Sequence, residues 1–145
     1  MIFRSLLITN RYFMLYYPPK IWLAFGETIK GNKEILDWLM KNGYPELAAL
    51  SHAVRGSEEA TAWLMKNGYP HLAALDAAID EDTMACEWLH KNKYDFFIVF
   101  ADACHAKPAA IQWFRQNHLE AILFIALKIK ELRDNTTFDY HKMHF

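Results

Sequence analysis

The stretch WLMKNGYPELAAL at residues 38–50 returns almost unchanged as WLMKNGYPHLAAL at residues 63–75. The two copies begin at Trp38 and Trp63 and differ only in their ninth residue. Further steps of the same length reach Trp88, in WLHKNKYDFF, and Trp113, in WFRQNHLEAI. A fixed period of this length is typical of supersecondary units that stack side by side because none can bury its apolar face alone. The sequence therefore predicts a repeat protein.

The first half of each unit has the periodicity of an amphipathic helix. Ala60, Trp63, Leu64 and Asn67 fall at i, i+3, i+4 and i+7 and so share one helix face. A helix of about eleven residues does not persist alone in water, so we expect this face to be buried against neighbouring units. One column of core tryptophans would result, formed by Trp38, Trp63, Trp88 and Trp113.

The start of each of these helices is marked in the sequence. Asn32, Ser57 and Asp82 share one column, and their side chains can accept a hydrogen bond from the first turn of a helix. The fourth unit instead carries Pro108, which suits the first helical position. These positions predict where the first helix of each of the four units begins.

The helix ends are marked by a second column. Gly43 and Gly68 can adopt the left-handed conformation that closes a helix, and a proline two residues later opens the next one. In the third and fourth units Lys93 and His118 replace the glycines. This replacement predicts a strained or differently built turn in those two units.

The repeats predict an all-α fold, an α-solenoid of about five antiparallel helix pairs with a 25-residue period. Residues 1–145 would form a single helical-repeat domain. We expect a divergent N-terminal cap over 1–20, with a helix at 3–17, repeats over 21–133, and a C-terminal cap or tail over 134–145.

Composition and net charge limit the classes of function that the chain can have. The chain is 53% apolar and 15% aromatic, which is enough to build one core. Its formal charge of -1 argues against a surface that follows phosphates, so we expect no nucleic-acid partner. Charged residues and prolines interrupt the apolar residues of 1–25, so we expect neither a membrane span nor a leader peptide. These features favour a cytoplasmic protein.

The two cysteines occupy columns that are mostly aliphatic in the other units. Buried free cysteine behaves as a small apolar side chain. We therefore interpret Cys86 and Cys104 as structural residues, and nothing in their spacing indicates a disulfide.

A possible partner surface comes from columns of the second helices whose chemistry changes between units. Such positions are either an ordinary solvated face or a groove that binds a ligand, basic at one end and acidic at the other. The predicted partner-binding residues are Lys30, His52, Arg55, Asp76, Asp80, Asp102 and His105.

Metal binding and catalysis find little support in the sequence. Asp102 and His105 lie three apart on an expected helix, and His118, His141 and His144 form a second loose set, but neither set has the spacing of a metal site. The chain contains no Gly-rich phosphate loop, no HExxH motif and no nucleophile elbow. We therefore assign no catalytic residue, metal or cofactor.

The strings GNKEILDWLMKNGY at 31–44 and GSEEATAWLMKNGY at 56–69 resemble the second helix of an ankyrin repeat. The preceding helix, with Leu50 and Val54, is similar to the first ankyrin helix. The resemblance covers residues 22–117. The Thr-Pro-Leu-His tetrapeptide is missing, and a period shorter than the usual ~33 residues leaves no room for the β-hairpin finger. The resemblance implies protein recognition without catalysis.

We therefore expect a non-catalytic protein–protein interaction module that binds another, unidentified protein and is a monomer or a weak homo-oligomer. One alternative is a structural or self-associating repeat module. Another is a small enzyme that uses the acidic and histidine residues of the groove.

Overall fold

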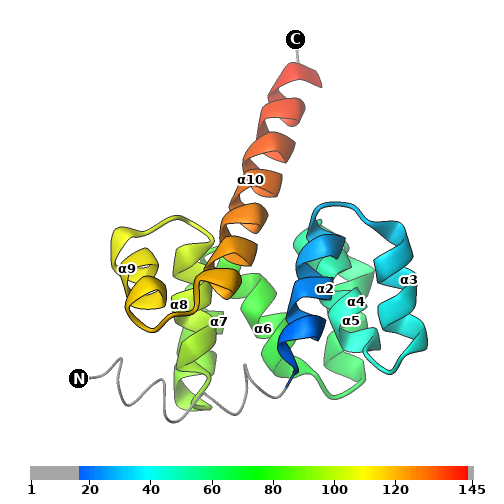
Figure 1. The fold of residues 1–145 in the computed structure, drawn as a ribbon, viewed down its shortest axis with the longest axis horizontal. Coiled ribbons are helices and arrows are strands. Elements are labelled where there is room, and N and C mark those ends of the chain that lie inside the picture. The colour runs from blue at the N-terminus through cyan, green and yellow to red at the C-terminus, as the bar shows by residue number, and fades with distance from the viewer. Residues whose placement is uncertain (1–16, 144–145) are drawn as a thin grey trace.

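The computed structural model describes the backbone of residues 17–143 and the side chains of residues 17–135 (Figure 1). Within this part of the chain all regular structure is helical, which confirms the all-α prediction. The helix expected over 3–17 lies outside the described residues except for Tyr17. The helices are α2 (Pro19–Ile29), α3 (Lys33–Lys41), α4 (Pro45–Val54), α5 (Glu58–Lys66), α6 (Pro70–Ile79), α7 (Thr83–Lys91), α8 (Asp95–Ala103), α9 (Pro108–Gln116) and α10 (Glu120–Met143).

The helices alternate between an inner and an outer layer. The inner helices α2, α4, α6, α8 and α10 pack each against the next, and α10 returns to pack against α2. Figure 1 shows α10 passing between α2 and the pair α8 and α9. The outer helices α3, α5, α7 and α9 each contact the two inner helices that flank them in the chain. The solenoid thus curls into a ring of inner helices.

The predicted register of the repeat is present in the helix starts. The outer helices begin at Lys33, Glu58, Thr83 and Pro108, which are evenly spaced at the period of the two sequence copies. The three expected N-cap side chains each accept a hydrogen bond from the backbone N–H three residues later, at 3.1–3.2 Å. These caps satisfy donors that have no partner within the helix, and they place each outer helix at the same point of its repeat.

Ring closure depends on a column of small buried residues on the inner helices. A Cβ atom on Gly26 would lie 3.1 Å from Cγ1 of Ile125, a tight contact, so α2 and α10 approach closely at this glycine. This column contains Asp76, which the sequence predicts to lie on an exposed surface because its chemistry changes between units, and that prediction is wrong. Its members are all buried: Gly26, Ser51, Asp76, Ala101 and Ala126.

The tryptophans keep the predicted register, but three of them are not core residues. Trp38, Trp63 and Trp88 are 39%, 37% and 36% exposed, so the prediction of a fully buried column is wrong for these three. Trp113 is buried, and Phe96 packs edge-on against it with ring centroids 5.6 Å apart. The fourth unit alone matches the expected burial.

In each outer helix the fully buried residue is the one that directly follows the tryptophan. Successive residues are about 100° apart around a helix, so a side chain next to the centre of the buried arc points to its edge. Apolar periodicity finds the arc but does not identify its centre, because a large side chain at the edge fits the same pattern. The residues at the centre are Leu39, Leu64, Leu89 and Phe114, all 0% exposed.

The turns that follow the outer helices are all built alike. Gly43 and Gly68 have φ values of 91° and 89°, while Lys93 and His118 have φ values of 65° and 55°. The expectation of a differently built turn is therefore wrong, because the non-glycine residues take the same left-handed conformation. They do so against the steric contact of Cβ with the backbone, which costs roughly 1–2 kcal/mol at such a position. The strain that the sequence predicts as the alternative is therefore found at Lys93 and His118.

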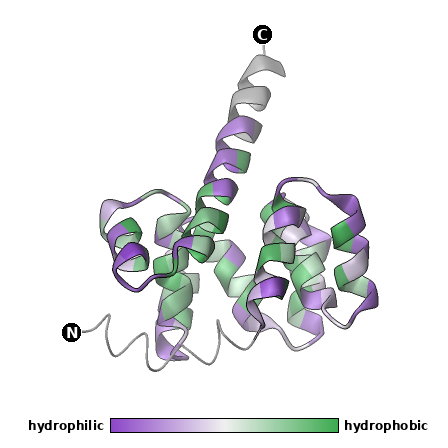
Figure 2. Cartoon of the chain, viewed as in Figure 1, coloured by the Kyte–Doolittle hydropathy of each residue, from purple (hydrophilic) through white to green (hydrophobic). Residues whose placement is uncertain are grey.

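The boundary expected at residue 134 is absent, because α10 runs without a break from Glu120 to Met143. No glycine or proline occurs in this segment to end the helix. Figure 2 shows that α10 is hydrophobic beside the other inner helices and hydrophilic further out. Among the described helices, none combines the length and the apolarity needed to cross a bilayer.

Two adjacent residues of α5 test this assignment of the core. Replacing Leu64 by Ala should lower the free energy of unfolding by ~2–5 kcal/mol, because the residue is completely buried. Replacing Met65, which is 58% exposed, by Ala should change the free energy of unfolding by less than ~0.5 kcal/mol. Urea denaturation followed by circular dichroism measures both values. Equal losses would contradict the burial order.

The left-handed turns give a second test of stability. Lys93→Gly should raise the free energy of unfolding by ~1 kcal/mol, because glycine removes the Cβ strain at φ 65°. Gly68→Lys should lower it by ~1 kcal/mol, because the same strain enters a turn that lacks it. Thermal and urea unfolding of both variants measure these shifts. A destabilised Lys93→Gly variant would show that the lysine side chain has another role.

Candidate binding surfaces

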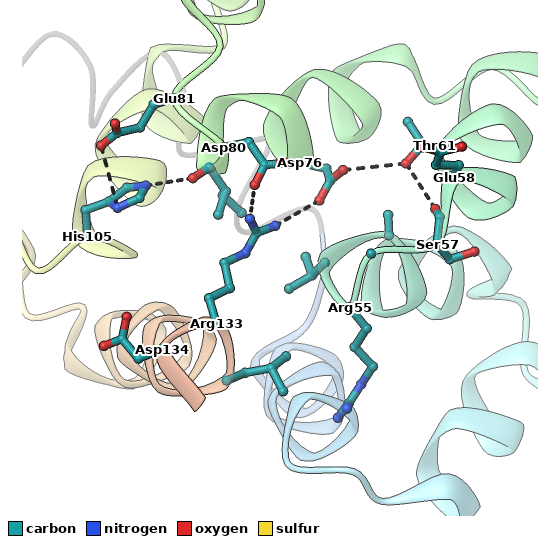
Figure 3. Close-up of a pocket in the computed structure, with 15 residues that line it drawn as sticks. Arg55, Ser57, Glu58, Thr61, Asp76, Asp80, Glu81, His105, Arg133 and Asp134 are labelled. Atoms are coloured by element: carbon teal, nitrogen blue, oxygen red, sulfur yellow. Dashed lines mark hydrogen bonds and ion pairs between the residues drawn. The ribbon is translucent and has the colours of Figure 1, made fainter. Parts of the chain in front are cut away.

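A polar cavity of about 690 Å³ opens where the inner helices α4 and α6 end (Figure 3). Its walls are the C-terminal ends of these two helices, the first turn of α5, and the C-terminal half of α10. Four of the seven predicted partner-binding residues line it: Arg55, Asp76, Asp80 and His105. We call it the polar cavity.

Arg133 of α10 reaches into the polar cavity and pairs with two carboxylates of α6. Its Nη2 lies 3.3 Å from Oδ1 of Asp76, and its Nη1 pairs with Oδ1 of Asp80. Figure 3 shows the side chain extending from α10 between the two acids. Both acids are distant from Arg133 in the sequence, at separations of 57 and 53 positions. The acids of the cavity thus hold the chain's own last helix.

Asp76 is the most deeply buried acid of the cavity, at 8% exposed. Burial is the main reason that the pKa of Asp76 is raised to about 6; the Arg133 guanidinium opposes this shift, and the negative charge of Asp80 adds to it. The hydroxyl of Thr61 donates to Oδ2 of Asp76 at 3.5 Å. Asp76 therefore changes its charge near neutral pH.

Arg55 and His105 cap the ends of inner helices. Nη2 of Arg55 donates to the carbonyl oxygens of Thr28 and Ile29, at 3.0 and 2.7 Å. Nε2 of His105 lies 2.6 Å from the carbonyl oxygen of Ile79, the last residue of α6. Each side chain thus contacts carbonyl groups at the C-terminal end of the preceding inner helix. Their first role is to join repeats.

The other three predicted residues lie elsewhere, so the seven do not form one surface. Lys30 pairs with Glu27 at 3.3 Å, and Asp102 pairs with Lys107 at 3.1 Å. His52 lines a groove on the outer face. The structure thus brings four of the seven together in the polar cavity and leaves Lys30, His52 and Asp102 outside it.

An apolar groove of about 410 Å³ separates α3 from α5, with α4 as its floor. Met40 forms one wall and Trp63 the other, and both are exposed, Met40 at 56%. Glu59 and His52 add polar groups at its margin. We call it the first outer groove; Pro45, Ala48, Ala49, Ser57 and Ala60 complete its lining.

The same residue types recur one repeat later, between α5 and α7. Met65 and Trp88 take the places of Met40 and Trp63, and both are exposed. Met84, at 78% exposed, stands where the first groove has Glu59. By equivalence with the first groove, we infer a second outer groove at this position. Pro70, Ala73, Ala74 and Ala77 occupy the positions of its floor.

The pattern stops between α7 and α9. At the methionine position stands His90, whose Nδ1 lies 2.6 Å from Oδ1 of Asp95, and at the tryptophan position stands the buried Trp113. A polar contact replaces the apolar wall, and the indole is no longer accessible. Within the described helices, this pattern of methionine and exposed tryptophan therefore occurs on two successive repeats.

Ring stacking holds the exposed indoles in place. Trp63 stacks on Tyr69 with centroids 6.1 Å apart and an 8° angle, and Trp88 stacks on Tyr94 at 6.0 Å and 5°. His71 stacks in turn on Tyr94, at 5.2 Å, and burial lowers the pKa of His71. An indole with one face already packed loses little freedom when a partner covers the rest.

Neither cysteine has the environment of a reactive thiol. Both are free, and burial raises the pKa of Cys104 far above that of an ordinary thiol. The pKa of Cys86 is also raised, first by burial and then by the charge of Asp102. Their interpretation as structural residues agrees with these environments. Within the described residues, no three His, Cys, Asp or Glu side chains are grouped so as to hold a metal ion.

Comparison with known protein families, with curated proteins and with solved structures gives no match. The fold and the two kinds of surface are therefore described from this chain alone. The ankyrin resemblance stays a prediction.

Both surfaces contain residues that the sequence analysis missed. Arg133 was assigned to the end of the repeats, and no sequence signal indicates its pairing with acids so far away along the chain. The outer grooves did leave a signal. Met40 and Met65 fall on the polar side of their helices, among Lys and Asp or Glu residues, where an apolar side chain is unexpected.

The buried acid predicts a pH dependence of stability. Because the folded-state pKa of Asp76 is raised from 3.8 to about 6, its favourable contribution is complete below pH 3.8 and is lost as the pH rises through about 6. Between pH 4.5 and 7.5, wild type should therefore lose about 2 kcal/mol relative to Asp76→Asn. Urea unfolding of both proteins across this range measures the difference.

Asp37→Asn serves as the control, because it removes an exposed carboxyl of α3. Its free energy of unfolding should run parallel to that of wild type over the same pH range. If Asp76→Asn also runs parallel, burial does not perturb Asp76.

Proposed function

We propose that this chain is a non-catalytic protein-binding module whose partner docks on the two outer grooves. The observation that carries the proposal is the repeated exposure of large apolar side chains on α3, α5 and α7. Soluble proteins rarely expose contiguous apolar surface of this kind unless it meets another molecule. Tryptophan and methionine are also enriched where proteins bind each other. The residues are Trp38, Met40, Trp63, Met65, Met84 and Trp88.

Mixed charge around the grooves favours a protein over a nucleic acid. Glu34 and Glu59 lie on α3 and α5 one turn before the exposed tryptophans, and acids at such positions repel phosphates. The first outer groove is also open to solvent, whereas small-molecule sites are enclosed clefts. A protein segment with its own apolar side chains meets both conditions.

The polar cavity is the weaker candidate for a partner site. Asp76 and Asp80 already pair with Arg133, and Arg55 already caps α2. A ligand that used these groups would first have to replace those interactions, and breaking a partly buried ion pair is costly. We therefore assign the cavity to holding α10 in place.

The ankyrin-like character and the cytoplasmic location form part of the same proposal. Short helix pairs that end in a left-handed turn support the first, with recognition moved to the outer helices because residues 17–143 contain no β-hairpin finger. Two free thiols in a described region of 17–135 support the second, since reducing compartments keep thiols free. Their raised pKa values support a non-catalytic role, because the thiolate is the reactive form.

Photo-crosslinking tests the proposal. A benzophenone amino acid at Met40 or Met65 should form an adduct of one defined mass in extract of the source cells, because these side chains line the outer grooves. The same group at Glu131 of α10, whose side chain is 61% exposed, should not form it. Mass spectrometry identifies the adduct.

Two outcomes count against the proposal. Adducts of equal yield at Glu131 would show that the outer grooves are not the docking surface. An adduct twice the mass of the 17.0 kDa chain would instead support the self-associating module.

A further inference from the structure

Each exposed tryptophan is followed by a lysine one helical turn later. The pairs are Trp38 with Lys41, Trp63 with Lys66, and Trp88 with Lys91. Residues three apart are neighbours on a helix surface, so each exposed tryptophan has a lysine beside it on the same face of its helix. In α9 both features are lost together, since the tryptophan is buried and the residue three later is Gln116.

The three lysines, which we call the lysine row, are exposed, and none of them forms an ion pair with another described residue. A lysine in the last turn also complements the helix dipole. That effect requires a cation in the last turn but not at one position. In α9 it is met by Arg115, one position away from the row. An acid four residues earlier supports Lys41 and Lys91, through Asp37 and Glu87, but Ala62 takes that position in α5. This support therefore does not account for the whole lysine row.

Negative charge does not follow the same rule. Acids stand one turn before the tryptophan in α3 and α5, at Glu34 and Glu59, but Met84 takes that position in α7. The lysine row is thus continuous over three helices, while each of the two acidic columns, Glu34 with Glu59 and Asp37 with Glu87, covers two. Complementary charge on a partner is therefore best placed opposite the lysine row.

We propose that the outer grooves bind an acidic amphipathic segment of a partner protein, an inference that rests on the proposed function. One apolar side chain enters each groove, between the methionine and tryptophan walls, and carboxylates face the lysine row. Packed helices lie ~8–10 Å apart, so the grooves are separated by at least about that distance. Residues three apart in an extended segment, or seven apart in a helix, cover about 10 Å.

Selection from a random peptide library displayed on phage tests this inference without a known ligand. Immobilised wild type should enrich peptides that combine two apolar anchors with aspartate or glutamate. The most enriched peptide, made synthetically with a fluorescent label, should bind about tenfold more weakly after Lys41→Glu, Lys66→Glu and Lys91→Glu are combined. Its affinity for wild type should also fall as salt is raised.

A variant of equal charge change is the control. Lys20→Glu, Lys33→Glu and Lys130→Glu together alter the net charge by the same amount away from the lysine row, and should change the affinity less than about twofold. Met65→Glu, at a position 58% exposed, should abolish binding without loss of folding, which circular dichroism checks.

The remaining outcomes separate this inference from the proposed function. Enriched peptides that are basic or uncharged, yet still fail to bind Met65→Glu, overturn the acidic partner and leave the outer grooves as the docking surface. Binding that neither Met65→Glu nor the lysine variants affect, or a library that yields no binder, overturns both. Sedimentation that shows dimers of wild type but not of Met65→Glu overturns the acidic partner and assigns the grooves to a second copy.

Discussion

Close packing of the inner helices is the constraint on which the structure depends. No described helix before α10 exceeds 11 residues, and helices so short do not persist alone. A column of buried residues runs along the inner helices, and at Gly26 the ring closes through a close approach of α10 to α2. Because the column must also fit between neighbouring helices, its chemistry varies while its size stays small, from Ser51 to Ala101.

The exposed tryptophans follow from the same constraint. Each outer helix is short and touches the inner layer through a narrow arc centred on Leu39 or its equivalents, so side chains at the edge of the arc remain partly in solvent. In a ring the inner helices pack tightly, while the outer helices lie further out and leave grooves between them. Trp63 and Met40 border such a groove, which makes it a natural place for a partner's apolar side chain.

The polar cavity shows a second consequence of the repeat. Arg55 and His105 share one column of the repeat, just after the inner helices α4 and α8, and each reaches carbonyls at the end of the preceding inner helix. Asp80 stands in the same column but, as a carboxylate, accepts instead of donating, and it pairs with Arg133 of α10. One change of residue type in the column thus converts a cap into an anchor for the last helix, and the long α10 is held across the ring.

The sequence alone determines the repeat register, the all-α class, the helix starts and the left-handed turns at the glycines. These features depend on local caps, glycines and periodicity. Four of the seven predicted site residues also meet in one cavity. The tertiary structure decided the rest: which edge of each outer helix is exposed, that α10 returns to α2, and that Arg133 pairs with Asp76. Periodicity places a side chain around its own helix, whereas burial and long-range pairing depend on where other helices lie.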